Sequence, residues 1–354
     1  NANTMNETFM KEKPVLPLLV SMALPNVISM LVNSLYNIVD SLFVAQISED
    51  AMTALSLVYP VQNLINAIAI GFGVGINAQI ALHLGAGEHK KANMVATHGL
   101  MLSLLHGVVI TVVSILIMPT FLRMFTIDET VIRMGVTYSR IAFLFSTVIM
   151  ATLAFEKIFQ AVGRMRVTMV GLMAGSVCNI ILDPMLIFGI GPFPEMGIRG
   201  AALATVIGQI FGMALGLWGV FRQQKVLNVN MREFKWRGQT IKDIYRVGLP
   251  GIVMQSVVSV MTAGMNGILI AFSQTAVNVL GVYFKLQTFV FMPVFGLNQG
   301  ALPVMGYNYG ARNRKRLMGA YKITLTAAVV IMALGLVLFQ LLPEQMLMLF
   351  VDKS

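Results

Sequence analysis

Residues 15–45 read VLPLLVSMALPNVISMLVNSLYNIVDSLFVA, a run in which Asp40 is the one charged side chain. An α-helix needs ~20 apolar residues to cross the ~30 Å hydrocarbon core of a bilayer, where every backbone amide must find its partner within the protein. The run therefore predicts a membrane-spanning helix. A carboxylate inside such a helix is costly, so Asp40 requires an explanation.

The composition extends this interpretation to the whole chain of 354 residues. Hydrophobic residues make up 57% and charged residues 11%, with a mean hydropathy of +0.78, which is far from the soluble globular range. We therefore expect an all-α polytopic membrane protein. The nine expected spans are 15–45, 53–83, 95–121, 136–160, 167–190, 197–221, 246–272, 277–305 and 320–342.

The net charge of +10 follows a membrane topology. Eighteen Lys and Arg residues fall in alternate connections, against four in the connections on the other side. The positive-inside rule then places the N-terminal segment 1–14 and the basic segment 222–245 in the cytoplasm, with the protein in the plasma (inner) membrane. Topology accounts for the basic charge, so nucleic acid is not expected as a partner. The single Cys178 excludes an internal disulfide and a Cys-based metal cluster.

A constant offset of 225 residues relates the start of the chain to its end. The matching positions are Leu24-Pro25 with Leu249-Pro250, Gly71 and Gly75 with Gly296 and Gly300, Gly85-Ala86 with Gly310-Ala311, Lys90 with Lys315, and Phe125 with Phe350. This offset crosses six spans and preserves their direction, which is typical of the two parallel lobes of secondary transporters. We expect an N-lobe in residues 15–221, an interlobe linker in 222–245 and a C-lobe in 246–354.

The second lobe is shorter than the first, because position 354 corresponds to position 129. The repeat predicts three further helices, twelve in all, and a complete protein of ~447 residues. On this interpretation the chain is an incomplete two-lobe bundle. With the polar interior of its second lobe open to lipid, it is not expected to support transport by itself.

Polar side chains surround Asp40 at helical spacing. One stripe of the first helix carries them at i, i+3, i+4 and i+7, namely Asn33, Tyr36, Asn37 and Asp40. In the fifth span, Asn179 and Asp183 are four residues apart and share a face. Asp40 lies eight residues before Ser48, and Asp183 lies eight residues before Gly191, so both carboxylates are expected ~12 Å below the outer surface.

A threonine in the sixth span, Thr205, reaches a similar depth, so these side chains can meet inside the first lobe. The predicted ion-coupling site consists of Asp40, Asp183, Asn179, Tyr36 and Thr205. Intramembrane carboxylates usually face a bundle interior or a water-filled cavity. Two acids held away from bulk water would share a proton as a pair, or bind Na⁺ together with Asn179 and Thr205. The alternative is that each Asp is a protonated, hydrogen-bonding strut between helices.

Other polar residues lie within the expected spans. The candidates for a substrate cavity are Asn33, Asn37, Lys285 and Gln287. Lys285 lies ~15 Å from the outer surface, near the midplane of the membrane. Glu156 and Lys157 lie near the inner end of the fourth span, and we expect their side chains to extend to the membrane surface.

The sequence resembles the multidrug and toxic compound extrusion (MATE) family, most closely its bacterial DinF-like branch. The resemblance depends on four stretches, which are LPNVISMLVNSLYNIVDSLFVAQI at 24–47, NIILDPMLIFG at 179–189, GIRGAALATVIGQ at 197–209 and LNQGALPVMGYNYGARN at 297–313. It implies two six-helix lobes that open alternately to each side and expel cationic drugs against H⁺ or Na⁺. It further implies that Asp40 and Asp183 form the cation site, with Asn179, Tyr36 and Thr205 beside them.

Other functions remain open at this point. A lipid-linked saccharide flippase of the same superfamily would line its cavity with cationic side chains, of which only Lys285 lies near the midplane. A non-transporting membrane fragment is a further alternative. An enzyme is not expected, because the sequence shows no recognisable pair of nucleophile and base. Small organic cations and membrane lipid are the expected partners, no cofactor other than the coupling ion is expected, and the protein is expected to be monomeric.

Overall fold

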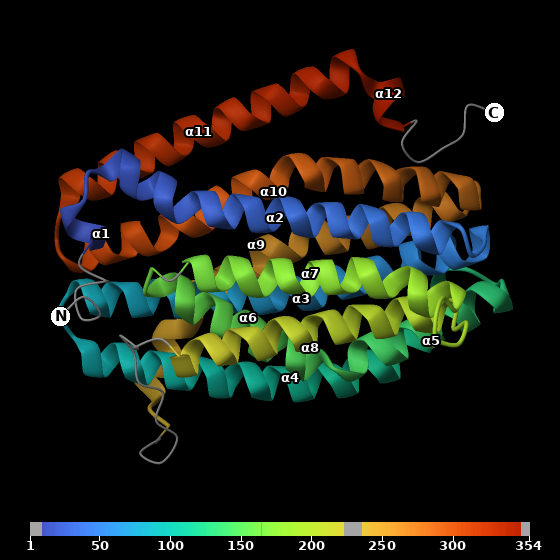
Figure 1. Ribbon diagram of the computed structural model, residues 1–354, viewed down its shortest axis with the longest axis horizontal. Helices are drawn as coiled ribbons and strands as arrows, with labels where there is room; N and C mark the ends of the chain where they lie inside the picture. The colour runs from blue at the N-terminus through green and yellow to red at the C-terminus, as the bar shows by residue number, and fades with distance from the viewer. Residues whose placement is uncertain (1–8, 164, 223–235, 348–354) are drawn as a thin grey trace.

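The computed structural model describes residues 9–163, 165–222 and 236–347, apart from some side chains within the helices (Figure 1). The described residues form helices and no strand, which confirms the all-α prediction. The helices are α1 (Phe9–Glu12), α2 (Val15–Ala45), α3 (Glu49–Gly85), α4 (His89–Phe125), α5 (Glu129–Leu144), α6 (Ser146–Ala161), α7 (Met165–Phe188), α8 (Ile198–Arg222), α9 (Gly238–Ile270), α10 (Gln274–Gly310), α11 (Arg314–Leu341) and α12 (Pro343–Leu347).

The predicted spans correspond to α2, α3, α4, the α5–α6 pair, α7, α8, α9, α10 and α11. Within the described residues, seven helices are long and apolar enough to cross a membrane, and the α5–α6 pair, bent by 49°, makes an eighth. Helix α10, which corresponds to the predicted span 277–305, is not among these eight. Several helices extend beyond their predicted spans, most clearly α9, which begins at Gly238 rather than at 246. The predicted lobe boundaries stay a prediction, and residues 223–235 of the linker lie outside the described part of the chain.

The long helices run side by side (Figure 1). The end that holds α1 and the connections 86–88 and 311–313 is called the inner end here, after the predicted topology, and the opposite end the outer end. Whether the inner end faces the cytoplasm stays a prediction. Helix α11 leans away from the bundle towards its C-terminal end (Figure 1).

The repeat of 225 residues is visible in how the helices begin and pack. The hydroxyl oxygen of Ser48 caps α3 by accepting from the backbone N–H of Ala51 at 3.0 Å, and Ser273 caps α10 through Ala276 at the same distance. Each pair of positions differs by 225. Helices α3 and α10 are therefore started by the same local signal.

Glycines of the repeat lie where helices from the two halves of the chain meet. A Cβ atom at Gly75 of α3 would lie 2.8 Å from the backbone nitrogen of Gly248 on α9. A Cβ at Gly300 of α10 would lie 2.8 Å from the backbone nitrogen of Ala23 on α2. Since 248 and 23 again differ by 225, the sequence repeat is also a repeat of contacts, and only glycine fits at these two close approaches.

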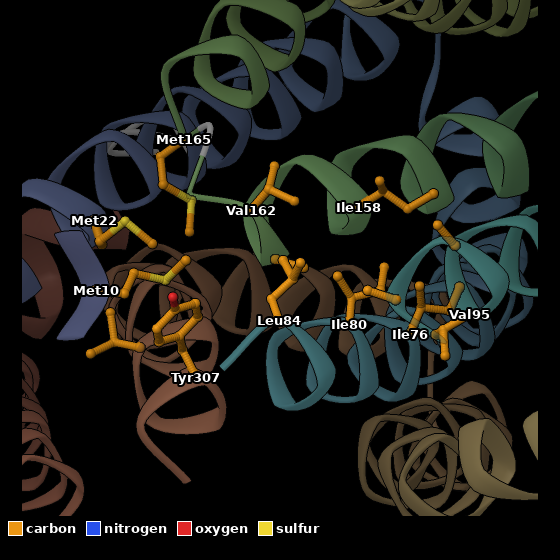
Figure 2. Packing of buried hydrophobic residues seen from close by; sticks show 14 of the residues in the cluster. Met10, Met22, Ile76, Ile80, Leu84, Val95, Ile158, Val162, Met165 and Tyr307 are labelled. Carbon is orange, nitrogen blue, oxygen red and sulfur yellow. The ribbon is translucent and has the colours of Figure 1, made fainter. Parts of the chain in front are cut away.

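The inner end of the bundle is a well-packed apolar core (Figure 2). Met10 of α1 is fully buried there, near Met22 and Tyr307 (Figure 2). The backbone carbonyl of Met10 accepts from Asn308 at 2.9 Å and from Arg316 at 3.0 Å. These bonds tie the N-terminal helix to α10 and α11.

Candidate functional site

The two predicted carboxylates meet inside the first half of the chain. Asp40 of α2 is 6% exposed, and Asp183 of α7 is fully buried. Their carboxyl groups lie within hydrogen-bonding reach of each other. Depth counting along two helices with the same direction thus predicted a contact between residues 143 positions apart.

Asn179 and Thr205 lie in the same region and are both buried. Helix α7 brings Asn179 one turn from Asp183, and the Thr205 hydroxyl donates to the carbonyl of Ala201 at 3.1 Å within α8. Helices α7 and α8 approach closely because glycines face each other. A Cβ at Gly175 would lie 2.8 Å from the carbonyl oxygen of Gly208, so these positions leave no room for a side chain.

Tyr138 of α5 belongs to this site, although the sequence interpretation did not include it. Its side chain is 2% exposed, forms hydrogen bonds with Thr205 and Gln62, and lies near enough to Asp40 and Asp183 to interact with their charges. A depth count from the predicted span, which begins at 136, places Tyr138 near the membrane surface. Because α5 begins at Glu129, Tyr138 instead lies nine residues, or ~14 Å, along the helix. We call Asp40, Tyr138, Asn179, Asp183 and Thr205 the acid cluster.

The two oxygens of Asp183 distinguish the acid cluster from an ordinary hydrogen-bonded core. Both are buried, and within the described residues no N–H or hydroxyl group donates to either of them. A buried carboxylate without donors is unfavourable unless a proton or a cation compensates it. The described residues contain no group of three or more His, Cys, Asp or Glu that could hold a metal. Two acids with amide and hydroxyl oxygens suit H⁺ or the singly charged Na⁺.

Several predicted residues are placed only by their helix. The side chains of Asn33, Tyr36 and Asn37 on α2, and of Lys285 on α10, lie outside the described part of the structure. Their roles in the coupling site and the substrate cavity therefore stay predictions. Gln287 is described and half-buried on α10.

The prediction that Glu156 and Lys157 extend to the membrane surface is wrong. Lys157 is fully buried, and Glu156 is partly buried beside it. A Cβ at Gly73 of α3 would overlap Cγ of Lys157, so the missing side chain of this glycine makes room for the lysine stem. The ammonium group of Lys157 donates to Oε1 of Gln160 at 3.3 Å rather than reaching water.

Gln160 is the hub of this second polar group. Its Nε2 amide nitrogen lies 3.1 Å from Oδ1 of Asn26, 3.2 Å from Oε1 of Glu156 and 3.5 Å from Oε1 of Gln299. The group thus joins α6 to α2 and, through Gln299, to α10. The name amide cluster is used below for these residues, which are Asn26, Glu156, Lys157, Gln160 and Gln299.

The MatE family model matches residues 25–185 and 250–354 of the chain. The multidrug export protein MepA of Staphylococcus haemolyticus (strain JCSC1435) is 25% identical over 326 residues, which cover 92% of this chain and 71% of that protein. MepA of Staphylococcus aureus (strain NCTC 8325 / PS 47) is 25% identical over 330 residues, with coverage of 93% and 71%.

Solved structures show the same fold. A MOP superfamily transporter from Pyrococcus furiosus, described as having a binding pocket of reverse polarity that suggests a different function, gives a TM-score of 0.89 at 26% identity. The match covers 98% of this chain and 76% of that one. The outward-facing conformation of a multidrug resistance MATE family transporter gives 0.89 at 27% identity, with coverage of 98% and 77%.

Proposed function

Because this chain belongs to the MatE family, whose members are membrane transporters rather than enzymes, we propose that it expels amphipathic organic cations from the cell in exchange for H⁺ or Na⁺. We place the coupling ion at one site and the substrate at a second. Exchange requires that occupation of the first changes the conformation that exposes the second.

The acid cluster is the proposed binding site of the coupling ion. The observation that carries this proposal is that Asp183 is fully buried against Asp40, and that no N–H or hydroxyl group among the described side chains donates to either of its oxygens. An ionised pair in this position is destabilised by desolvation and mutual repulsion, and one proton or one Na⁺ relieves both. Loading and emptying the pair therefore changes the free energy of the surrounding helices. The coupling free energy of the exchange derives from this difference.

A small pocket between α3, α9 and α10 is the proposed location of the substrate site. It is lined by aromatic, aliphatic, methionine and small polar side chains and one glycine, which are Met52, Leu55, Ser56, Tyr59, Thr262, Asn266, Gly281 and Phe284. Met and aromatic side chains adapt to varied apolar ligands, and aromatic faces attract cations. This lining fits the multidrug export named for the MepA relatives.

A lipid-linked saccharide flippase is the less favoured alternative. Its pyrophosphate group would need exposed cationic side chains in the cavity. Lys157 is a buried cation, but it bonds with Gln160 and lies beside the acid Glu156. Its charge is thus compensated within the protein rather than offered to an anionic lipid.

Transport by acid variants tests the proposal. In lipid vesicles, we expect Asp40→Asn and Asp183→Asn each to abolish gradient-driven transport of ethidium, a cationic dye, while the folded protein is retained. Asp243→Asn on α9, an acid that accepts from Gln239 at 2.8 Å outside the acid cluster, is the control and should transport normally. Applying H⁺ and Na⁺ gradients separately identifies the ion. Full transport by both variants would contradict the proposal. Loss of folded protein would favour the alternative in which each Asp is a protonated, hydrogen-bonding group that holds helices together.

A further inference from the structure

Helix α3 packs against helices of both halves of the chain. It packs against α5 and α6 within the first half of the chain, and against α9 and α10 of the second half. Two consecutive residues of α3, Gln62 and Asn63, form hydrogen bonds on these two sides. Successive residues of an α-helix are ~100° apart around its axis, so neighbouring side chains can reach different partners.

Gln62 makes the connection towards the acid cluster. Its side chain is hydrogen-bonded to Tyr138, which also bonds with Thr205 and lies near both carboxylates. The Tyr138 hydroxyl has one hydrogen to donate and can accept others. The direction in which that hydrogen points therefore depends on the acceptors around it, and the charge of the acid pair is the strongest of these influences.

Asn63 makes the connection towards the second half. Its Nδ2 amide donates to the hydroxyl oxygen of Ser259 on α9 at 2.7 Å, and Ser259 is 2% exposed. Two turns before Asn63, the carbonyl of Ser56 accepts from Asn266 of α9 at 3.1 Å. Polar bonds between helices inside a membrane have no water to replace them, so a change in either helix must break or re-form them.

We propose that Gln62 and Asn63 are positioning residues that transmit the charge state of the acid pair to α9, and so couple ion binding to movement of the two halves of the chain. When the pair is ionised, Tyr138 donates its hydrogen towards Asp40 and accepts from the amide of Gln62. When the pair is loaded, that hydrogen is released and turns to the carbonyl oxygen of Gln62. The Gln62 amide must then rotate, and α3 shifts with it against the bond between Asn63 and Ser259.

This inference depends on the proposed function, and it makes α3 a two-state element that both the acid pair and α9 influence. A residue of this kind affects coupling more than binding. The variants Gln62→Leu and Asn63→Leu should therefore keep their affinity for the ion, while the conformational response to the ion is lost.

Spin labels at the inner end provide the measurement. Lys90 and Lys315, which are both exposed and related by the repeat, are each replaced by cysteine on a Cys178→Ser background. The labelled protein is then studied in nanodiscs. In the parent protein, lowering the pH or adding Na⁺ should change the distance distribution between the two labels. In Gln62→Leu and Asn63→Leu the change should be absent, and ethidium transport in vesicles should fall about tenfold. Equilibrium binding of the ion should remain within about twofold of the parent.

Two further variants make the result decisive. Gln79→Leu, the same substitution at a half-buried position elsewhere on α3, should respond like the parent. Ser259→Ala removes only a hydroxyl, and it should reduce the distance change even if the leucine variants fail to fold. A full distance change in Ser259→Ala, or in both leucine variants, overturns the inference. Normal transport by both Asp40→Asn and Asp183→Asn would instead reject the proposed function itself, so the two failures are distinguishable.

Discussion

The acid cluster and the amide cluster are both buried and polar, but they differ in how their charges are compensated. The acid cluster holds two carboxylates within the first eight helices, and in the part of the chain that the structure describes no N–H or hydroxyl group donates to Asp183. The amide cluster places Lys157 beside Glu156 and surrounds both with amide groups. The first is therefore favourable only when it is loaded with a cation, whereas the second is complete by itself.

The two clusters also differ in reach. Apart from the link through α3, the acid cluster lies within α2, α5, α7 and α8, whereas the amide cluster crosses to α10 through Gln299. The bent α5–α6 pair connects them, with Tyr138 on one arm and Lys157 on the other. On the proposed function, the acid cluster responds to the ion, whereas the amide cluster joins helices at the inner end of the bundle.

The largest expected effect is a difference in the free energy of unfolding between variants of the two clusters. Lys157→Met leaves Glu156 and Gln160 buried without their cation, and we expect a loss of about 3 kcal/mol in the free energy of unfolding. Asp183→Asn removes a buried carboxylate to which no described N–H or hydroxyl group donates. The free energy of unfolding of this variant should fall by less than about 1 kcal/mol, or rise. Unfolding in mixed micelles measures both. Lys242→Met, at an exposed position on α9, is the control.

Equal destabilisation by Lys157→Met and Asp183→Asn would remove the distinction between the two clusters. Both would then be structural polar groups. The transport assay alone could no longer assign ion coupling to the acid cluster, because loss of transport would follow from loss of structure.

The acid cluster was largely predictable because its geometry is set by local rules. The helical period places Asn179 and Asp183 on one face, and counting from the helix ends brings Asp40 and Thr205 to the same depth. Tyr138 was missed because a tyrosine in a membrane span is ordinary by itself. Its role depends on three neighbouring helices that no local pattern specifies.

The amide cluster could not be predicted in the same way. Lys157 is four residues from the end of α6, a distance at which a lysine normally reaches the membrane surface. It is buried instead because Gly73, more than eighty residues earlier in the chain, leaves a space on α3 that holds its stem. Whether a lysine near a helix end is buried thus depends on contacts between distant segments, which local sequence patterns do not show.

A smaller effect is expected when the contact between α6 and α10 is removed. Gln160→Leu deletes the hub of the amide cluster, and we expect the population with separated inner ends to rise about tenfold, or ~1.4 kcal/mol. The label pair at Lys90 and Lys315 reports it as a longer distance. Gln299→Leu, which removes one acceptor, should have a weaker effect in the same direction. An unchanged distance in Gln160→Leu would mean that packing alone closes the inner end.

The smallest expected effect is the change in the free energy of unfolding on Gly73→Ala. Whether this change is destabilising or stabilising tests whether Lys157 fills the space beside Gly73. A Cβ at this position would overlap Cγ of Lys157 and lie 3.3 Å from its Cδ, so Gly73→Ala should destabilise the protein by about 1 kcal/mol. On a Lys157→Ala background the obstructing stem is gone, and the same substitution should become neutral or stabilising, because alanine favours a helix over glycine by up to ~1 kcal/mol.

Gly264 of α9, where a Cβ would meet nothing within 4 Å, is the matched control, and Gly264→Ala should be neutral or stabilising on both backgrounds. The double-mutant cycle isolates the contact between Gly73 and Lys157 from the loss of the lysine itself. If Gly73→Ala costs the same with and without the lysine side chain, the stem does not occupy this space. The amide cluster would then lose the packing that keeps Lys157 buried, and its difference from the acid cluster would have to be explained by hydrogen bonds alone.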